Sequence, residues 1–294
     1  MNPIQRRRLP PLATLIAGLV LAAGASLTAA ERDDSAAEKL GWHLATKSYT
    51  FIKLTLSETL DISKQLGLRY IELNPSQKFS KERPEATNQD SSPELREAIK
   101  KRLAELGITA LGFGVIKLDG NEAGDRKIFQ FAKDLGIQVI VSEPPGDAFG
   151  LLDKLTAEYG IKVAMHNHPE PSPYWKPEIV LATIMGHSAA IGACADVGHW
   201  ARSGLKPVDC LHQLEGHIIS LHFKDTNKVG KGARDVPFGT GQADVKGMLT
   251  ELKRQGFKGL FSLEYESGAS GDQLIGELKQ SIAFFDETAK ELAR

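Results

Sequence analysis

A repeating pattern of an apolar run, a polar turn and an amphipathic stretch constrains the fold of this chain more than any other feature. The pattern is clearest in three segments, LSETLDISKQLGLRYIEL, SPELREAIKKRLAELGITALGF and EAGDRKIFQFAKDLGIQVIVSE. In each segment apolar residues recur at three- and four-residue intervals, which is helical spacing. A Leu-Gly pair then ends the helix, and a run typical of a strand buried on both faces follows. The segments therefore predict helices that alternate with buried strands.

Extended along the chain, the pattern predicts eight strands, at residues 42–49, 68–73, 108–114, 137–143, 161–167, 191–196, 217–223 and 259–264. The helices expected between and after the strands span residues 57–66, 93–106, 121–135, 148–159, 177–187, 206–214, 243–255 and 272–291. Eight alternating units favour a closed (β/α)₈ barrel, an α/β TIM barrel, as one domain at 41–291. An open doubly wound sheet is the alternative, but the glycine-rich phosphate turn it usually carries is not found. The polar stretch 31–39 is expected to be a frayed lead-in.

Composition narrows the class of protein without identifying it. The 294 residues are 41% hydrophobic and 25% charged, which excludes collagen-like, disulfide-scaffold and mostly disordered chains. The 36 basic and 37 acidic residues nearly cancel, to a net charge of −1. Because nucleic-acid binding usually needs a basic excess, we expect no nucleic-acid partner.

The first thirty residues form the pattern of a secretory signal. Arg6–Arg8 make a positive segment, residues 12–23 are apolar, and Thr28 and Ala30 suit a cleavage site after Ala30. The apolar run is shorter than the roughly 20 residues of a membrane span. We therefore predict that 1–30 is a cleaved signal peptide and that the protein is periplasmic or secreted, without stable membrane insertion after cleavage. The export route, Sec or twin-arginine, is left open.

The chain has two cysteines, Cys194 and Cys210. An exported protein could join them in a disulfide. Two buried thiols on different elements are the favoured interpretation, because a bridge needs Cα atoms within about 7 Å.

Acidic and imidazole side chains stand where the last five predicted strands end. They are Glu143, His166 and His168, Asp196 and His199, His222 with Lys224 and Asp225, and Glu264 with Glu266. Because the C-terminal ends of the strands carry the active site in barrels of this kind, we expect these side chains to share one rim.

Three carboxylates and one imidazole in that set resemble a ligand set for a metal ion. Glu143, Asp196 and Glu264 would raise one another's pKa unless a cation neutralised them. With His222 they form an oxygen-rich set that suits one Mn²⁺, Mg²⁺ or Co²⁺, with Zn²⁺ also possible. Each residue also has a structural alternative: a helix-dipole partner, a helix cap, a core histidine or a surface ion pair. The position of all four on one rim favours the metal.

These residues resemble the sugar isomerase and epimerase members of the xylose isomerase-like barrels. The resemblance covers residues 41–291 and depends on Glu143-Pro144, Asp196-x-x-His199, His222-Phe-Lys-Asp225 and Glu264. It implies one divalent metal held by Glu143, Asp196, His222 and Glu264. It also implies that Glu143 and Glu264 act as catalytic acid and base groups on opposite sides of a carbohydrate substrate. Relatives in this superfamily include ketose 3-epimerases, hydroxypyruvate isomerase and inosose dehydratase, and a homo-oligomer is possible.

The chemistry of isomerisation explains these residue types. Moving a proton beside a carbonyl passes through an enediolate, whose negative oxygen a divalent cation stabilises. Two carboxylates on opposite faces allow a proton to leave one face and return to the other. His199 can hydrogen-bond a substrate oxygen or support the ligands. His168, Lys224 and Asp225 are the further candidate substrate contacts.

Three other functions compete with the isomerase hypothesis. The endonuclease branch of the superfamily needs further histidines, but strand two ends at Glu72-Leu73-Asn74 and strand three at 112–114 without one. A metal-dependent lyase or dehydratase on a keto-sugar or keto-glycoside shares the first proton abstraction and stays open. A non-catalytic metal- or sugar-binding protein would not need two opposed glutamates.

Overall fold

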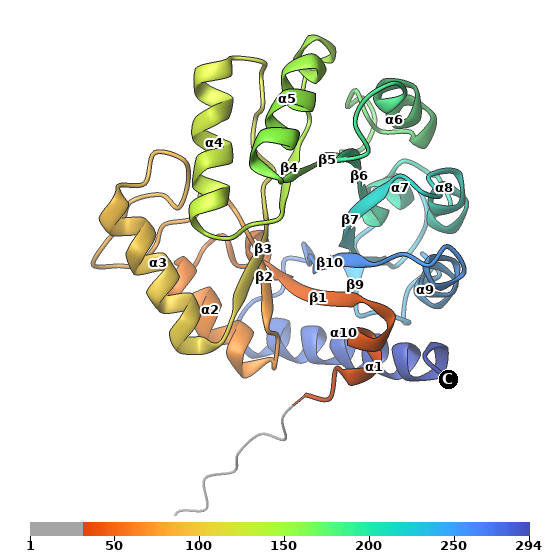
Figure 1. Ribbon diagram of the computed structural model, residues 1–294. Helices are drawn as coiled ribbons and strands as arrows, with labels where there is room; N and C mark the ends of the chain where they lie inside the picture. The colour runs from red at the N-terminus through yellow and green to blue at the C-terminus, as the bar shows by residue number, and fades with distance from the viewer. Residues whose placement is uncertain (1–31) are drawn as a thin grey trace, which may run out of the picture. The chain divides into compact units, whose positions relative to one another are not determined.

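Eight parallel strands close into a barrel in the order β1-β10-β7-β6-β5-β4-β3-β2 (Figure 1). The strands are β1 Trp42–Lys47, β2 Tyr70–Leu73, β3 Thr109–Phe113, β4 Val139–Ser142, β5 Lys162–His166, β6 Ile191–Asp196, β7 Ile218–Phe223 and β10 Gly259–Leu263. The computed structural model describes residues 32–294, so the predicted signal peptide at 1–30 lies outside the described residues. The (β/α)₈ barrel is confirmed, and each strand lies within two residues of its predicted bounds.

Helices surround the barrel (Figure 1). They are α1 Ser35–Leu40, α2 Leu56–Gln65, α3 Pro93–Leu106, α4 Glu122–Asp134, α5 Phe149–Tyr159, α6 Pro177–Ile184, α7 Val197–Arg202, α8 Pro207–Gln213, α9 Val245–Arg254 and α10 Gly271–Leu292. Two 3₁₀ turns, η1 Ser48–Phe51 and η2 Gly146–Ala148, follow β1 and β4. Among the described residues, no helix has the length and apolar character needed to cross a membrane.

Local sequence signals begin and end these helices. The Thr55 side chain accepts a hydrogen bond from the Glu58 amide, and the Glu58 carboxylate accepts one from the Thr55 amide, which makes a capping box at the start of α2. Ser92 caps α3 just before Pro93. Gly107 ends the same helix with a φ of 65°, a left-handed conformation that glycine adopts without strain. The Leu-Gly pairs of the sequence pattern therefore mark true helix ends.

The structure corrects the sequence-based expectation in three places. Residues 31–39 were expected to be frayed, but Ser35–Leu40 form α1, which packs against α10, and Arg32 makes a bidentate ion pair with Asp286. A short helix, α7, starts directly after β6. The loop after β7 forms a small antiparallel hairpin of β8 Asp225–Thr226 and β9 Asp235–Val236. These elements are too short to leave a periodic signal in the sequence.

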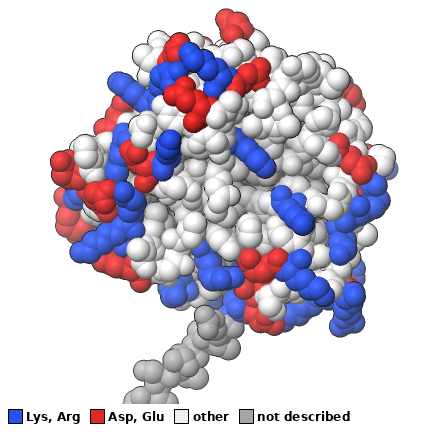
Figure 2. Space-filling model, in the orientation of Figure 1, with Lys and Arg blue, Asp and Glu red and all other residues white. Residues whose placement is uncertain are grey.

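The barrel interior changes from apolar to polar along its axis. Two small apolar clusters, one around Val139 and Ala164 and the other around Ala45 and Leu260, are separate from the large core between strands and helices. Strand register places Asp196 beside His222, and His222 beside Ser262. The parallel strands therefore bring buried polar side chains to one level at their C-terminal ends. Figure 2 shows the surface from one side, with basic and acidic side chains intermixed around a largely uncharged centre.

Candidate metal and active site

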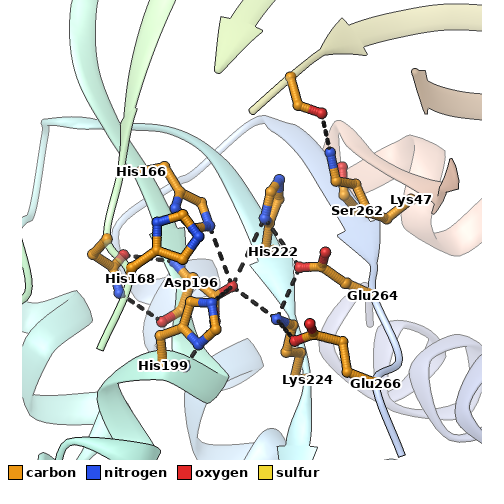
Figure 3. A network of polar contacts seen from close by, with 12 residues as sticks. Lys47, His166, His168, Asp196, His199, His222, Lys224, Ser262, Glu264 and Glu266 are labelled. Carbon is orange, nitrogen blue, oxygen red and sulfur yellow. Dashed lines mark hydrogen bonds and ion pairs between the residues drawn. The ribbon is translucent and has the colours of Figure 1, made fainter. Parts of the chain in front are cut away.

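Asp196 is the centre of a buried polar cluster at the C-terminal ends of β5, β6, β7 and β10 (Figure 3). Its Oδ1 accepts a hydrogen bond of 2.7 Å from the His199 amide and so caps α7. Its Oδ2 faces three imidazoles, at 3.4 Å from His166 Nε2, 3.5 Å from His199 Nε2 and 3.7 Å from His222 Nδ1. The predicted helix-cap alternative for Asp196 is therefore true of one oxygen, while the other is directed into the site.

Glu264 lies on the other side of His222, directly after β10. Its Oε2 is 3.1 Å from His222 Nδ1 and 2.8 Å from Lys224 Nζ. Burial alone would raise the pKa of Glu264 and of Asp196, but the positive charge of Lys224 and contacts with the nearby imidazoles outweigh this effect. Both carboxyls therefore have pKa values well below their ordinary ones and are ionised at neutral pH.

Glu143, the first residue after β4, is one imidazole away from this cluster. Its Oε1 is 3.0 Å from His166 Nδ1 and also contacts His168 Nδ1, while its Oε2 accepts a hydrogen bond from Ser172. Burial works to raise the pKa of Glu143, but the hydrogen bonds from His166 and His168 hold it below its ordinary value. Three of the four predicted ligands thus gather directly, and Glu143 connects to them through His166.

Two further histidines differ in protonation because their surroundings differ. His199 Nδ1 accepts a hydrogen bond from Arg202, so the ring proton is on Nε2, which faces Asp196. Burial lowers the pKa of His199 to about 2, so the ring is neutral. The hydrogen bond with Glu143 raises the pKa of His168, whose side chain is 49% exposed. The site therefore offers a neutral hydrogen-bond donor and a half-exposed imidazole whose pKa is raised.

The donor set fits a divalent metal ion. One ligand atom from each of His166, Asp196 and His222 lies within 4.8 Å of the other two. His222 Nδ1 is buried and is not aligned for a hydrogen bond with Glu264, and it has no other hydrogen-bond partner among the described residues. A buried imidazole nitrogen without a hydrogen-bond partner, between two carboxylate oxygens, is the arrangement expected of a metal ligand.

Two predicted substrate contacts have surroundings that differ from the expected ones. Lys224 is fully buried, and its Nζ contacts Asp196, Glu264 and Glu266. Asp225 is 1% exposed, and its carboxylate accepts four backbone hydrogen bonds, one from Thr226 in β8 and three from the loop that follows β9. Lys224 thus lies among the carboxylates of the cluster and Asp225 holds backbone amides of a loop, while their roles as substrate contacts stay predictions.

Several residues of the cluster were not assigned from the sequence. His166 lies between Glu143 and Asp196, and its place at the end of β5 on the same face as Ala164 was the available signal. Glu72, Lys47 and Ser262 form a buried network behind His222. Nothing in the sequence marks that network, because its members come from three separate strands.

The comparisons with known proteins agree with this architecture. The family model of the xylose isomerase-like TIM barrel matches residues 60–288. A crystal structure of an uncharacterised protein from Parabacteroides distasonis is 34% identical, with a TM-score of 0.68, and the match covers 84% of this chain and 99% of that one. Among curated proteins, none matches the chain.

Structures below 25% identity share the fold. A D-tagatose 3-epimerase-like protein is 18% identical with a TM-score of 0.67, over 85% of this chain and 98% of its own. A Mycobacterium smegmatis protein in complex with magnesium is 12% identical with a TM-score of 0.68, over 87% and 99%. Others of this fold are D-psicose 3-epimerase with D-fructose, the IOLI protein with a zinc atom, and the probable 3-DHS dehydratase AsbF from Bacillus anthracis.

The closed eight-strand barrel, the polar cluster at its C-terminal end and the family match over most of the sequence lead to one conclusion. This chain belongs to the xylose isomerase-like TIM barrel family.

Proposed function

We propose that this protein is an exported, divalent-metal-dependent isomerase or epimerase of sugars. The observation that carries the proposal is the position of two ionised glutamates at the two ends of one row of contacts. The row runs from Glu143 through His166 to Asp196, and from there through His222 to Glu264. A sugar bound beside Asp196 would have one carboxylate at each end.

The roles of the side chains follow from their protonation. One ionised glutamate removes the proton from the carbon beside the carbonyl, and the other takes up a proton from solvent when substrate is bound and returns it to the opposite face. His168 is in contact with Glu143, is half-exposed and has a raised pKa, so it is placed to hold a proton from solvent beside Glu143. His199 presents its Nε2–H to a substrate oxygen. The metal, held by Asp196, His222 and Glu264 with Glu143 or His166, would act as a Lewis acid toward the substrate oxygen that gains charge.

The test is turnover in D₂O by metal-loaded protein, with a panel of aldoses, ketoses and keto-glycosides followed by NMR. Deuterium in the recovered or rearranged sugar supports the proposal. Glu143→Gln and Glu264→Gln should each lower the rate by roughly 10²–10⁴ while circular dichroism stays unchanged. Glu178→Gln, at an exposed position of α6, is the matched control and should keep full activity. Full activity in both site variants would overturn the mechanism.

A metal-dependent lyase or dehydratase is the second candidate. It is favoured by His168, an exposed acid beside Glu143 that could protonate a leaving group, and a dehydratase is among the proteins of this fold. In the same D₂O experiment, loss of water or of an aglycone would establish the lyase instead. If metal-loaded protein binds sugars but turns over none of the panel, the non-catalytic binding protein is the remaining function.

Export is proposed from residues 1–30 alone. The mature protein should begin at Glu31, because the predicted cleavage follows Ala30. Intact mass and N-terminal sequencing of protein from a periplasmic or culture fraction check this, and an uncleaved chain found only in the cytosol would contradict it.

A further inference from the structure

A buried carboxylate behind His222 is not used by the mechanism above. Glu72, near the end of β2, is 0% exposed, and its Oε1 lies 2.9 Å from His222 Nε2. The strands β2 and β7 are not neighbours in the barrel, because β1 and β10 lie between them. Glu72 therefore reaches across the interior to meet the ring on the side away from Asp196.

The other partners of Glu72 donate hydrogen bonds to it. Lys47 Nζ donates to Glu72 Oε1 at 2.7 Å, and Ser262 Oγ donates to Glu72 Oε2 at 2.5 Å. Lys47 also donates to the Gly114 carbonyl, so the ammonium has a second partner. A buried carboxylate with a buried lysine beside it stays ionised and acts as an acceptor.

The position of Gly112 shows how closely this arrangement is packed. A Cβ added at Gly112 on β3 would lie 2.7 Å from Glu72 Cγ and 2.9 Å from Leu260 Cδ2. Real Cβ atoms essentially never come so close, so any side chain at 112 would push Glu72 away from its place. Because Gly112 has no side chain, the Glu72 side chain can occupy the space beside it and extend to His222.

We infer that Glu72 is a positioning residue for the metal centre. It accepts a hydrogen bond from the Nε2–H of His222, which keeps the ring proton on Nε2 and leaves the Nδ1 lone pair directed at the ion. A neutral imidazole has one N–H and one lone pair, and a metal ligand must offer the lone pair. His222 Nδ1 is the nitrogen between Asp196 and Glu264, and it is the one without a hydrogen-bond partner among the residues described. This inference rests on the metal centre proposed above.

Two double variants separate the hydrogen bond from the ion pair. Lys47→Met with Glu72→Leu removes both charges and the acceptor, whereas Lys47→Met with Glu72→Gln removes both charges but keeps an amide oxygen for His222. Mn²⁺ affinity is measured by the electron paramagnetic resonance signal of free Mn²⁺, which does not depend on turnover. We expect the Leu variant to bind Mn²⁺ about 10–100-fold more weakly than wild type, and the Gln variant to recover most of that loss. Equal affinities in the two variants would overturn the inference.

A measurement on the wild type keeps the inference testable even if both variants fail to fold. In ¹⁵N-histidine protein loaded with Mg²⁺, two-bond ¹H–¹⁵N correlations identify which His222 nitrogen carries the proton. A proton on Nε2 supports the inference, and a proton on Nδ1 overturns it. Wild-type protein that binds neither Mn²⁺ nor Mg²⁺ overturns the proposed metal centre and this inference together. Tight wild-type binding with equal affinities of the two variants overturns the inference alone.

Discussion

Lys224 Nζ lies 2.9 Å from Asp196 Oδ2, and both side chains are fully buried. The same ammonium is 2.8 Å from Glu264 and 2.8 Å from Glu266. Burial lowers the pKa of a lysine, but the surrounding carboxylates raise that of Lys224 well above its ordinary value. The Lys224 ammonium is therefore a built-in cation that pairs with Asp196 and Glu264, the same two carboxylates that would bind the proposed metal.

Replacing this cation should destabilise the protein most when no metal is present. Lys224→Met leaves three carboxylates without their shared partner, which we expect to cost about 3–5 kcal/mol of unfolding free energy in a chelator. Saturating Mn²⁺ should reduce the deficit, because a bound ion stabilises the folded state and supplies positive charge there. Urea unfolding with and without Mn²⁺ measures both values. Lys246→Met breaks an exposed ion pair with Glu291 and should change stability by less than about 1 kcal/mol. A loss below that level for Lys224→Met would contradict the prediction.

His199 should make stability depend on pH in the acid range. Burial, with help from nearby cations, lowers its pKa in the folded state to about 2, whereas the unfolded chain has a pKa near 6.5. The unfolded state therefore binds a proton that the folded state does not, so stability is fully present above about pH 6.5 and falls as the pH decreases. The slope from one such proton is about 1.4 kcal/mol per pH unit.

His199→Gln removes that contribution. Between pH 6 and pH 4, in the presence of a chelator, its unfolding free energy should fall less steeply than that of wild type. The difference in slope should be about 1.4 kcal/mol per pH unit, the contribution of one proton. His217→Gln, at an exposed position before β7, serves as the control for the same exchange of residue type. Parallel curves for wild type and His199→Gln would show that the ring is protonated in the folded state.

Asp225 is expected to matter for the loop and not directly for substrate binding. Its Oδ2 accepts hydrogen bonds of 2.9 Å from the Gly239 and Gly241 amides, and its Oδ1 accepts from Thr226 and Ala243. Asp225→Ala should lower stability by about 1–3 kcal/mol, because buried and partly buried amides lose their acceptor. Hydrogen exchange of residues 238–243 should become faster, with a smaller change in Asp225→Asn, which keeps one oxygen. If hydrogen exchange were unchanged and the KM for substrate were raised, the result would instead support the prediction from the sequence that Asp225 contacts substrate.

The two cysteines should be inert thiols. Cys194 and Cys210 are both free and buried, and burial raises the pKa of Cys210 to about 12. Because the thiolate is the reactive form, Ellman's reagent should modify native protein slowly and find two thiols per chain after unfolding. A reductant should leave the melting temperature unchanged. A shift in melting temperature on reduction would reveal a disulfide.

Much of the barrel could be predicted because it depends on local chemistry. Leu-Gly helix ends, caps such as Ser92 and continuous apolar strands each act within a few residues, so the strand bounds agree with the structure. The hairpin of β8 and β9 could not be predicted in this way. Its two-residue strands are held by pairing across the loop and by Asp225, not by any periodic pattern.

The sequence by itself determined the eight-unit barrel and the row of acids and imidazoles at the strand ends, because strand periodicity and loop position are properties of neighbouring residues. Only the tertiary structure decided what each polar group faces. It turned one oxygen of Asp196 to a helix and the other to the site, placed His166 between Glu143 and Asp196, and set Glu72 against His222 from across the barrel. Those pairings join residues from different strands, up to 150 positions apart, so their geometry depends on barrel closure and side-chain packing.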